Sequence, residues 1–415
     1  MRLLILTQYF PPEMGAPQSR LYELARRLKE MGHQITVLTS LPNYPTGRIL
    51  EGYRGRVRMK ENMEGIRIVR TVLYPSKSKS LLPRLLSYLS FAASSLLIGV
   101  WGLGKQDVVL IESPPLFLMP AGLIMTKMKR AKPLMMVADI WPDIIIRMGR
   151  LSSSSLSAKA MLCLERFCYE QASAIALTTP GMYNQIRSRF PHLPNVTIIS
   201  NGVDTRLFRP DLREQKLRQE FRAGPSDFLV GYCGLHGLCQ GLEVVLQAAG
   251  KLRHRTDIRF IMVGDGPAKE SLVQMAEDMN LQNLRFLDHR PKPHIPPILA
   301  SLDVSLMPLA FRLPGAMPSK VYEALASGAV PIVAKGSDAA LLINQNNAGL
   351  TYEPGDAEEL ARAITKLADN RALCRTIREN CLRLAKRFDR EVLAQRAAET
   401  LTAVAEGKPL PPVSW

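Results

Sequence analysis

Lys320 and Glu323 stand one helical turn apart in a segment whose ends are typical of a helix. The segment PSKVYEALASGAVPIV begins with Pro318 and Ser319, which favour a helix N-terminus, and Gly328 favours its end. A helix N-terminus offers unpaired N–H groups and partial positive charge, and both suit a phosphate. With Lys320 beside that phosphate and Glu323 accepting hydrogen bonds from ribose hydroxyls, the segment predicts a nucleoside diphosphate site. An ordinary capped helix with a surface ion pair is the alternative.

Two carboxylates follow apolar runs that favour buried strands. Asp139 stands near the end of PLMMVADI and begins DIWPD, and Glu112 stands in ESPP after DVVLI. A carboxylate at the carboxyl end of a strand can orient or deprotonate an acceptor hydroxyl. Helix capping by Asp143, the second acid of DIWPD, is the alternative.

Three loops with glycines follow predicted strands. Glycine lets a backbone approach a ligand closely, although none of these loops matches a GxGxxG or Walker pattern. The two histidines in loops at strand ends are further candidates, although an ordinary polar loop role is the alternative. The candidate binding residues from these loops are Gly15, Ala16, His236, Gly237, Gly264, Asp265, His289 and Arg290.

Several other kinds of chemistry lack their usual patterns. The six histidines form no H-x-x-x-H or H-x-E pair, and the six cysteines are scattered without a C-x-x-C. No G-x-S-x-G elbow occurs. We therefore expect reduced thiols, no metal and no cofactor. The pattern favours chemistry that runs on binding, orientation and stabilisation of a leaving group.

The order of the predicted elements is α/β. Apolar strands alternate with helices from the N-terminus, the pattern resets at NGVD, and a second alternating series follows. Two Rossmann-like, doubly wound domains facing a central cleft are expected, with the ligand at their carboxyl edges. The expected parts are an N-terminal domain over 1–204, a linker over 205–228, a C-terminal domain over 229–385, and a last helix and tail over 386–415 that return to the N-terminal domain.

Basic residues are concentrated in the first half. Residues 1–200 carry 26 Lys and Arg against 12 Asp and Glu, within a formal net charge of +17. The segment 85–104 is uncharged, about as long as a spanning helix, and flanked by Arg84 and Lys105. This arrangement favours an anionic membrane surface over nucleic acid as the partner. A helix lying in the inner leaflet, a buried helix and a true span are the alternatives.

Together these segments resemble the GT-B glycosyltransferases of family 4 over almost the whole chain. The similar motifs are FPPEMGAPQSRLYELARRLKEMGHQITVLT, SNGVD, VGDGP and PSKVYEALASGAVPIV, in family order. PNYPTG, ESPPLF and DIWPD resemble a narrower branch. That branch contains bacterial transferases that build O-antigen, capsule or colanic-acid-type polysaccharide, including the N-acetyl-L-fucosamine transferase type.

The resemblance implies retaining sugar transfer from a nucleotide sugar, most often UDP-linked, without a metal. Ser319 and Lys320 would hold the diphosphate, Glu323 would bind the ribose, and the Gly15 loop would contact phosphate from the other domain. Neighbouring donor contacts would come from Gly315, Ala316 and Pro318.

The sequence departs from the family pattern at four positions. Gly315 stands where the family has an acid eight residues before Glu323, so its backbone amide is expected to take over that contact. Leu235 and Gln240 replace an Arg and a Lys, and Glu112 stands near the usual catalytic histidine. Diphosphate binding is therefore expected to depend mainly on Lys320.

The expected function is transfer of a sugar, such as an N-acetylated 6-deoxyhexose or hexosamine, from a UDP-sugar to a polyprenyl-diphosphate-linked glycan. The enzyme would be cytoplasmic and peripherally bound to the inner face of the cell membrane. A nucleotide-sugar epimerase on the same architecture is one alternative, and donor alone would then yield a new nucleotide sugar. A non-catalytic nucleotide-sugar-binding protein is the other, and it would release no UDP.

Overall fold

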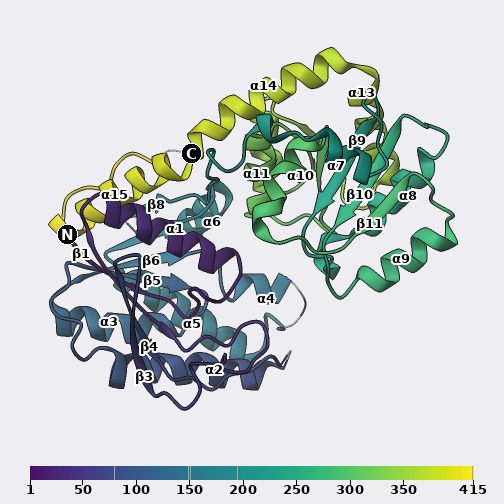
Figure 1. Ribbon diagram of the computed structural model, residues 1–415. Helices are drawn as coiled ribbons and strands as arrows, with labels where there is room; N and C mark the ends of the chain where they lie inside the picture. The colour runs from purple at the N-terminus through teal and green to yellow at the C-terminus, as the bar shows by residue number, and fades with distance from the viewer. Residues whose placement is uncertain (79, 148, 150, 194, 414) are drawn as a thin grey trace. The chain divides into compact units, whose positions relative to one another are not determined.

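The computed structural model describes residues 1–78, 80–147, 149, 151–193, 195–413 and 415. The chain divides into two compact units (Figure 1). The first unit contains Met1–Ser200 and Leu393–Trp415, and the second contains Asn201–Val392. Each is built around a mostly or wholly parallel sheet.

An eight-stranded sheet forms the core of the first unit in the order β3-β4-β2-β1-β5-β6-β7-β8. The order reverses at β1, which pairs in parallel with both β2 and β5. This is the switch point at whose carboxyl edge doubly wound sheets bind ligands. The strands are β1 (Arg2–Leu6), β2 (Gln34–Ser40), β3 (Arg58–Met63), β4 (Ile66–Thr71), β5 (Val108–Ser113), β6 (Lys132–Val137), β7 (Ala174–Leu177) and β8 (Val196–Ile198).

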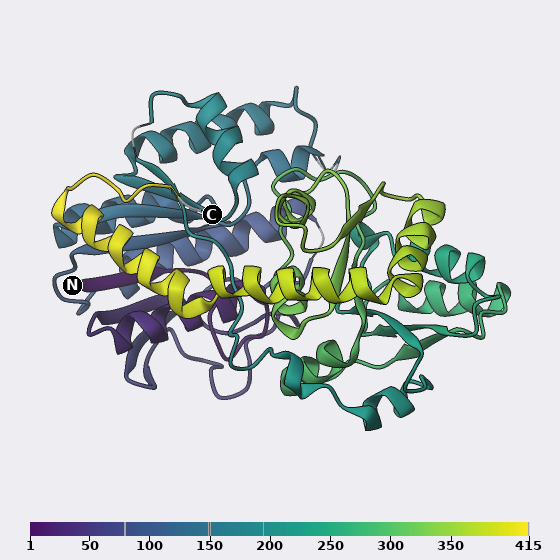
Figure 2. The same cartoon turned by 90° about the horizontal axis from the view of Figure 1, so that it is seen from above.

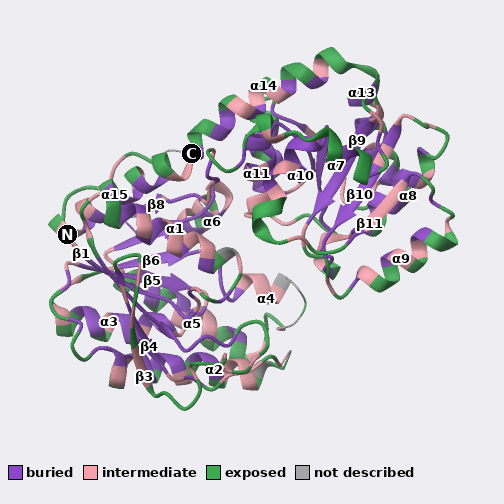
Figure 3. Ribbon diagram, viewed as in Figure 1, coloured by how far each residue is buried: buried purple, intermediate pink, exposed green. Residues whose placement is uncertain are grey.

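The two faces of this sheet pack into separate apolar layers. Leu3 and Ile5 of β1 join the layer of α1 and α15, whereas Leu4 and Leu6 join the layer of α2, α3, α5 and α6. Figure 3 shows most strands buried and exposed residues along the helices. The helices are α1 (Ala16–Glu30), α2 (Leu81–Ser94) with a π-helical continuation (Ser95–Gly99), α3 (Leu118–Lys129), α4 (Asp143–Arg147), α5 (Leu156–Gln171) and α6 (Pro180–Arg189).

The last helix, α15 (Arg390–Glu406), belongs mostly to the first unit, which the chain re-enters at Leu393. Ala397 and Leu401 are fully buried in the layer that Leu3 also lines. In both ribbon views the yellow helix lies beside the purple N-terminal elements (Figures 1 and 2). The segment that packs against the first sheet therefore begins at 393, somewhat later than the expected 386.

The antiparallel strand β3 was not expected from the sequence. Its residues RMKENM are mostly polar because β3 lies at the edge of the sheet, where no face is fully buried. Glu64 and Gly65, both at positive φ, turn the chain into β4, and Asn62 accepts a hydrogen bond from the Gly65 amide at 2.7 Å.

The second sheet has six parallel strands in the order β11-β10-β9-β12-β13-β14, with its own reversal at β9. The strands are β9 (Phe228–Cys233), β10 (Ile258–Val263), β11 (Leu284–Leu287), β12 (Val304–Met307), β13 (Val330–Ala334) and β14 (Leu350–Tyr352). The helices are α7 (Gln215–Glu220), α8 (Glu243–Lys251), α9 (Lys269–Asp278), α10 (Ile295–Ser301), α11 (Ser319–Ser327), α12 (Asp338–Gln345), α13 (Ala357–Asp369) and α14 (Arg371–Arg387), with 3-10 turns at Pro210–Leu212, Leu238–Gln240 and Lys292–His294.

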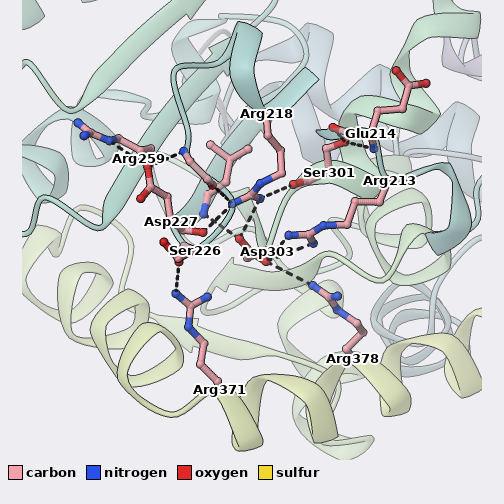
Figure 4. Close-up of polar contacts among 12 residues, drawn as sticks. Arg213, Glu214, Arg218, Ser226, Asp227, Arg259, Ser301, Asp303, Arg371 and Arg378 are labelled. Carbon is pink, nitrogen blue, oxygen red and sulfur yellow. Dashed lines mark hydrogen bonds and ion pairs between the residues drawn. The ribbon is translucent and has the colours of Figure 1, made fainter. Parts of the chain in front are cut away.

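The stretch 205–228, expected to be a linker, is folded into the second unit. Arg218 on α7 is only 1% exposed and donates to the Asp303 carboxylate at 3.2 Å (Figure 4). The same guanidinium donates to the backbone oxygens of Ser301 at 2.9 Å and Asp227 at 2.6 Å. These bonds hold α7 against the sheet.

Asp303 is the centre of this network (Figure 4). Besides Arg218, its carboxylate faces Arg213 at 3.3 Å and Arg378 at 3.6 Å, and it accepts from the Leu229 amide at 2.9 Å. One carboxylate thus connects the stretch 205–228, the strand β9 and the helix α14. Because a buried guanidinium is costly without a partner, the unit depends on this one acid.

We expect Asp303→Asn to destabilise the second unit by about 3–5 kcal/mol, because it leaves the Arg218 charge buried and unmatched. Hydrogen exchange read by mass spectrometry measures the two units separately. Exchange should accelerate in β9 and β12 and stay unchanged in β1 and β5. Asp288→Asn is the matched control, since the Asp288 side chain is 98% exposed and its pair with Lys269 is a surface pair. Equal effects of the two substitutions would refute the assignment.

Candidate functional site

The helix expected at PSKVYEALAS is present as α11. Pro318 occupies the N-cap position, and Gly328 ends the helix in the left-handed conformation at φ 71°. β12 leads into the loop before α11, and β13 follows it, so the N-terminus of α11 lies at the carboxyl edge of the second sheet. The first-turn N–H groups of Ser319 and Lys320 have no intrahelical acceptor and are available to an anion.

The ammonium of Lys320 is seated on Tyr232, the fifth residue of β9. It donates to the Tyr232 hydroxyl at 2.8 Å and lies 4.1 Å from the centre of the ring. Burial lowers the pKa of Lys320 to about 8, against the opposing effect of the charges on Cys233 and Glu323. An anion bound beside this ammonium would favour its charged form.

Three glycines make room for this arrangement. A Cβ on Gly234 would lie 2.0 Å from the Lys320 Nζ, and Gly234 has φ +145°. A Cβ on Gly264 would lie 1.9 Å from the Gly234 oxygen, and one on Gly266 would lie 2.4 Å from the His236 oxygen. The loops after β9 and β10 therefore pack backbone against backbone. We call these two packed loops, which lie next to Lys320, the floor of the site.

His236 is part of this floor and not an open ligand-binding side chain, which corrects the expectation for it. Its backbone N–H donates to the Asp265 oxygen at 2.8 Å, and its oxygen accepts from the Ala268 amide at 2.9 Å. The imidazole is fully buried against Tyr232 and Phe286, and this burial lowers its pKa to about 4. The next residue, Gly237, is buried as well, whereas the Asp265 side chain is exposed.

Glu323 lies one turn after Lys320 and is half-buried. Desolvation raises the pKa of its carboxyl group, while Arg390, Lys320 and Lys292 each act to lower it. Three cations therefore surround this acid within the second unit. A carboxylate in such surroundings is able to accept hydrogen bonds from a pair of hydroxyls, and the ribose-binding role of Glu323 stays a prediction.

The Gly315 loop differs from the expectation for it. Gly315 has φ +84°, and its amide donates to the Asp338 carboxylate at 3.1 Å instead of pointing free toward a ligand. The next residue, Ala316, accepts from the Ala339 amide at 3.3 Å. The first turn of α12 thus holds the loop in place, so the amide expected to replace the missing acid already has a partner.

The remaining donor candidates lie at the surface. His289 is exposed, and Arg290 pairs with the Glu220 carboxylate on α7, which holds the guanidinium that was expected to bind the donor. Leu235 and Gln240 fall in the loop after β9, where neither brings a charge. Lys320 is therefore the cation that the structure seats beside the N-terminus of α11.

In the first unit, Gly15 precedes α1 at the carboxyl end of β1. Its backbone is extended, and an added Cβ would meet only the side-chain oxygen of Gln18 at 2.3 Å. Ala16 begins α1, and its side chain lies outside the described residues. Glu13, only 4% exposed, shapes this loop by accepting from the amides of Asn43 at 2.7 Å and Tyr44 at 2.8 Å.

Glu112, at the end of β5, is held on both oxygens. It pairs with Arg20 of α1 at 2.6 Å and accepts from the Thr7 hydroxyl. Burial raises its pKa, and the Arg20 charge offsets part of that rise. Because both oxygens are occupied and the side chain is 3% exposed, Glu112 is placed to position its neighbours and not to react.

Asp139 follows β6 at the same edge and remains open to solvent. Desolvation by the surrounding protein raises the pKa of the Asp139 carboxyl group, and the charge of Arg20 acts against that rise. Asp143 behaves differently, since it begins α4 and binds Gln185 and Arg189. The structure thus brings Asp139 and Glu112 to one edge, as predicted, and leaves Asp139 as the accessible carboxylate.

Three residues of these sites were not identified from the sequence. Tyr232 lies inside a buried strand and gave no signal beyond its apolar surroundings. Arg20 precedes the apolar stripe of α1, so its inward direction was not visible. Arg390 is more than sixty residues from Glu323 in sequence, and only the return of the chain brings the two together.

The comparisons with known proteins agree with this geometry. The family described as "Glycosyl transferase 4-like domain" matches residues 15–202, and the family "Glycosyl transferases group 1" matches residues 227–370. A putative colanic acid biosynthesis glycosyl transferase, WcaI of Escherichia coli K12, is 26% identical over 80% of this chain and 83% of that protein. A probable glycosyltransferase, WbjE of Pseudomonas aeruginosa, is 24% identical over 64% of this chain and 67% of that protein.

Solved structures share the fold. Anabaena HepE in complex with UDP has a TM-score of 0.72 at 20% identity, covering 97% of this chain and all of that one. WaaG, a glycosyltransferase involved in lipopolysaccharide biosynthesis, has a TM-score of 0.67 at 18% identity with the same coverage. The expected fold, two Rossmann-like domains of the GT-B type, is confirmed.

The seat of Lys320 predicts a titration that can be measured. Labelling with acetic anhydride, read by mass spectrometry, should show Lys320 half-reactive near pH 8, because the ammonium is charged below that pH and neutral above it. Gly234→Ala should move this midpoint toward the ordinary value of about 10.4, since the new Cβ expels the ammonium from Tyr232. Gly224→Ala is the control, because its Cβ meets Asp227 only at an ordinary 3.5 Å. A midpoint unmoved by Gly234→Ala would contradict the proposed seat.

Proposed function

We propose that this chain, a glycosyltransferase of the GT-B fold, is a retaining enzyme that uses a UDP-sugar. The acceptor is a polyprenyl-diphosphate-linked glycan of cell-surface polysaccharide biosynthesis, and the sugar is an N-acetylated 6-deoxyhexose or hexosamine. The observation that carries this proposal is the ammonium of Lys320, held on Tyr232 beside the N-terminus of α11.

Departure of UDP leaves negative charge on the β-phosphate. The first-turn N–H groups of α11 and the Lys320 ammonium lie where they would stabilise that charge. Glu323, one turn further along the same helix, would bind the ribose hydroxyls. The acceptor hydroxyl then attacks from the face that the leaving group departs, and the configuration is retained.

We propose that this chemistry needs no metal or cofactor. No group of three or more His, Cys, Asp or Glu side chains that could hold a metal ion occurs among the described residues. Lys320 and the helix N-terminus supply the positive charge that a metal would otherwise bring to the diphosphate.

Asp139 is the residue we assign to the acceptor hydroxyl. It is open to solvent, and its raised pKa reflects a site in which taking up a proton is favoured. Glu112 and Arg20, paired at 2.6 Å, would keep the edge of the sheet in shape and hold positive charge near Asp139. Glu112 is thus a positioning residue.

UDP is the nucleotide favoured by the structural relatives. HepE was solved with UDP, with UDP and glucose, and with UDP-glucose, and it covers nearly the whole chain. A GDP-mannose-dependent mannosyltransferase of Mycobacterium tuberculosis is also similar, 24% identical over 89% of this chain. A donor screen therefore includes both nucleotides.

We also propose that the enzyme is cytoplasmic and lies on the inner face of the membrane through α2. Leu82–Gly99 is long and apolar enough to cross a membrane by length and composition, with 39% of this window buried in the structure. We name the exposed side chains on its outer side the α2 stripe. It consists of Leu82 (67% exposed), Leu86 (46%), Leu89 (44%) and Leu97 (69%).

The inner side of α2 makes an interfacial position more favourable than a span. Phe91 is fully buried in the core of the first unit, and Ser94 donates to the Thr71 hydroxyl at 3.0 Å. Removing α2 from the sheet would uncover that core. The basic run at 54–60 reaches the end of the apolar segment, where Arg58 donates to the Trp101 oxygen. Lys79, a basic residue that precedes α2, lies outside the described residues.

A screen for UDP release, using nucleotide sugars and a lipid-linked acceptor in membranes, tests the activity. Lys320→Ala should lower the turnover number by about 100-fold or more, because the leaving charge loses its cation. Lys251→Ala is the control, since that side chain forms a surface pair with Glu358. Unchanged turnover in Lys320→Ala would refute the assignment. A new nucleotide sugar from donor alone would indicate an epimerase, and UDP binding without release would indicate a non-catalytic protein.

Membrane docking predicts a second effect. Replacing Leu82, Leu86 and Leu89 together by Ser should weaken binding to phosphatidylglycerol vesicles at least tenfold, because each exposed leucine would otherwise bury apolar surface worth about 1.5–3 kcal/mol. Co-sedimentation at low and high salt separates the apolar contribution of the leucines from the electrostatic contribution of the basic flanks, because salt screens only the second. Leu341→Ser in the second unit is the control, at 44% exposure. Equal binding of both variants would remove α2 from the docking surface.

A further inference from the structure

Arg84 is the one charged residue between Ser80 and Gly104. It lies in the first turn of α2, between Leu82 and Leu86 of the α2 stripe. A lone cation in an apolar surface helix usually extends to water, because desolvating a guanidinium is costly. Arg84 is instead half-buried, so we expect its partners inside the first unit.

The guanidinium lies on the inner face of α2. It donates to the Tyr88 hydroxyl at 3.1 Å, one turn along the helix. Tyr88 is 7% exposed and packs against Phe117 and Trp141, with ring centres 6.4 and 6.1 Å away. Phe117 follows β5, and Trp141 stands two residues after Asp139. Arg84 therefore faces the carboxyl edge where we place the acceptor hydroxyl.

Tyr9 adds a hydrogen-bond donor to the same place. It follows β1, and the charge of Arg84 acts on it against the strong rise that burial gives its pKa. Because that pKa stays well above the ordinary value, the Tyr9 hydroxyl keeps its proton at physiological pH. A guanidinium and two phenol hydroxyls, from Tyr9 and Tyr88, thus gather at one edge.

Three other inward arginines of the first unit each face a carboxylate. Arg20 pairs with Glu112, Arg27 with Glu23 and Arg70 with Glu61. For Arg84, no acidic partner is found in the part of the chain that the structure describes. Its guanidinium can therefore offer its charge to an anion from outside the protein.

We propose that Arg84 binds the phosphate of a lipid-linked diphosphate acceptor. This inference rests on the proposed function and names how its acceptor is held. Leu82 and Leu86 of the α2 stripe lie within one turn of Arg84, about 5 Å along the helix. Phosphates of membrane lipids lie just above the acyl chains, so lipid-facing leucines and an inward guanidinium at that spacing match a lipid whose diphosphate leads toward Asp139. Arginine suits such an oxyanion because its N–H groups form paired, charge-assisted bonds.

Direct binding tests this without sugar transfer. The probe is geranyl diphosphate, titrated by calorimetry into the full chain carrying Lys320→Ala, which removes the diphosphate site of the second unit. Arg84→Gln should weaken binding about tenfold or more, because a charge-assisted contact is lost. Arg84→Lys should retain part of the affinity. Arg26→Gln is the control, since Arg26 is similarly half-buried but paired with Glu23 and Glu30.

The outcomes separate the sources of phosphate. Equal binding of geranyl diphosphate by the Arg84→Gln and Arg26→Gln proteins overturns the proposal. Loss of binding to phosphatidylglycerol vesicles in Arg84→Gln, with geranyl diphosphate binding intact, also overturns it and assigns the residue to bulk lipid headgroups. Arg84-dependent diphosphate binding in a protein that never releases UDP supports this inference and refutes the proposed function. Circular dichroism of both Arg84 variants checks the fold.

Discussion

The cost of burying an ionised group without a partner is the constraint on which both units depend. That cost is several kcal/mol per charge, so buried charges survive only in pairs or networks. Asp303 forms ion pairs with three arginines of the second unit, and Glu112 forms one with Arg20 in the first unit. Three charged groups, Lys320, Asp139 and Arg84, differ from these because the structure gives them no close ion pair among the described residues. Lys320 rests on a neutral tyrosine, Asp139 is influenced by the charge of Arg20, and Arg84 donates to a phenol.

The paired and the unpaired groups lie at opposite edges of the second sheet. Asp303 directly precedes β12, at the amino edge, where its network closes the unit. Lys320 follows at the carboxyl edge, where glycine loops interlock and leave space. A parallel sheet makes this division possible because every strand begins at one edge and ends at the other. Stability can thus be concentrated at the amino edge, while Lys320 rests on Tyr232 at the carboxyl edge, where we propose that the donor binds.

Periodicity and turn residues were enough to predict the α/β order, the parallel strands and the bounds of α11. They could not reveal what depends on distant contacts. Residues 205–228 were expected to be a linker because nothing in the local sequence shows that Arg218 turns inward onto Asp303. His236 looked like a loop ligand, but the glycines around it bury it under the backbone of the next loop. β3 carries no apolar alternation, since an edge strand buries no full face. The pairing of Glu112 with Arg20 joins residues that only the switch of strand order brings together.

The return of the chain at Leu393 has a consequence for how the protein is made. The apolar layer that Leu3 and Ile5 begin is completed by Ala397 and Leu401, and the whole second unit is synthesised in between. At about 5–20 residues per second, the first sheet leaves the ribosome on the order of ten seconds or more before the helix that covers part of it. During that interval an apolar strip of the nascent chain is open to chaperones or to misplaced contacts. The unit that is translated first is therefore the last to be finished.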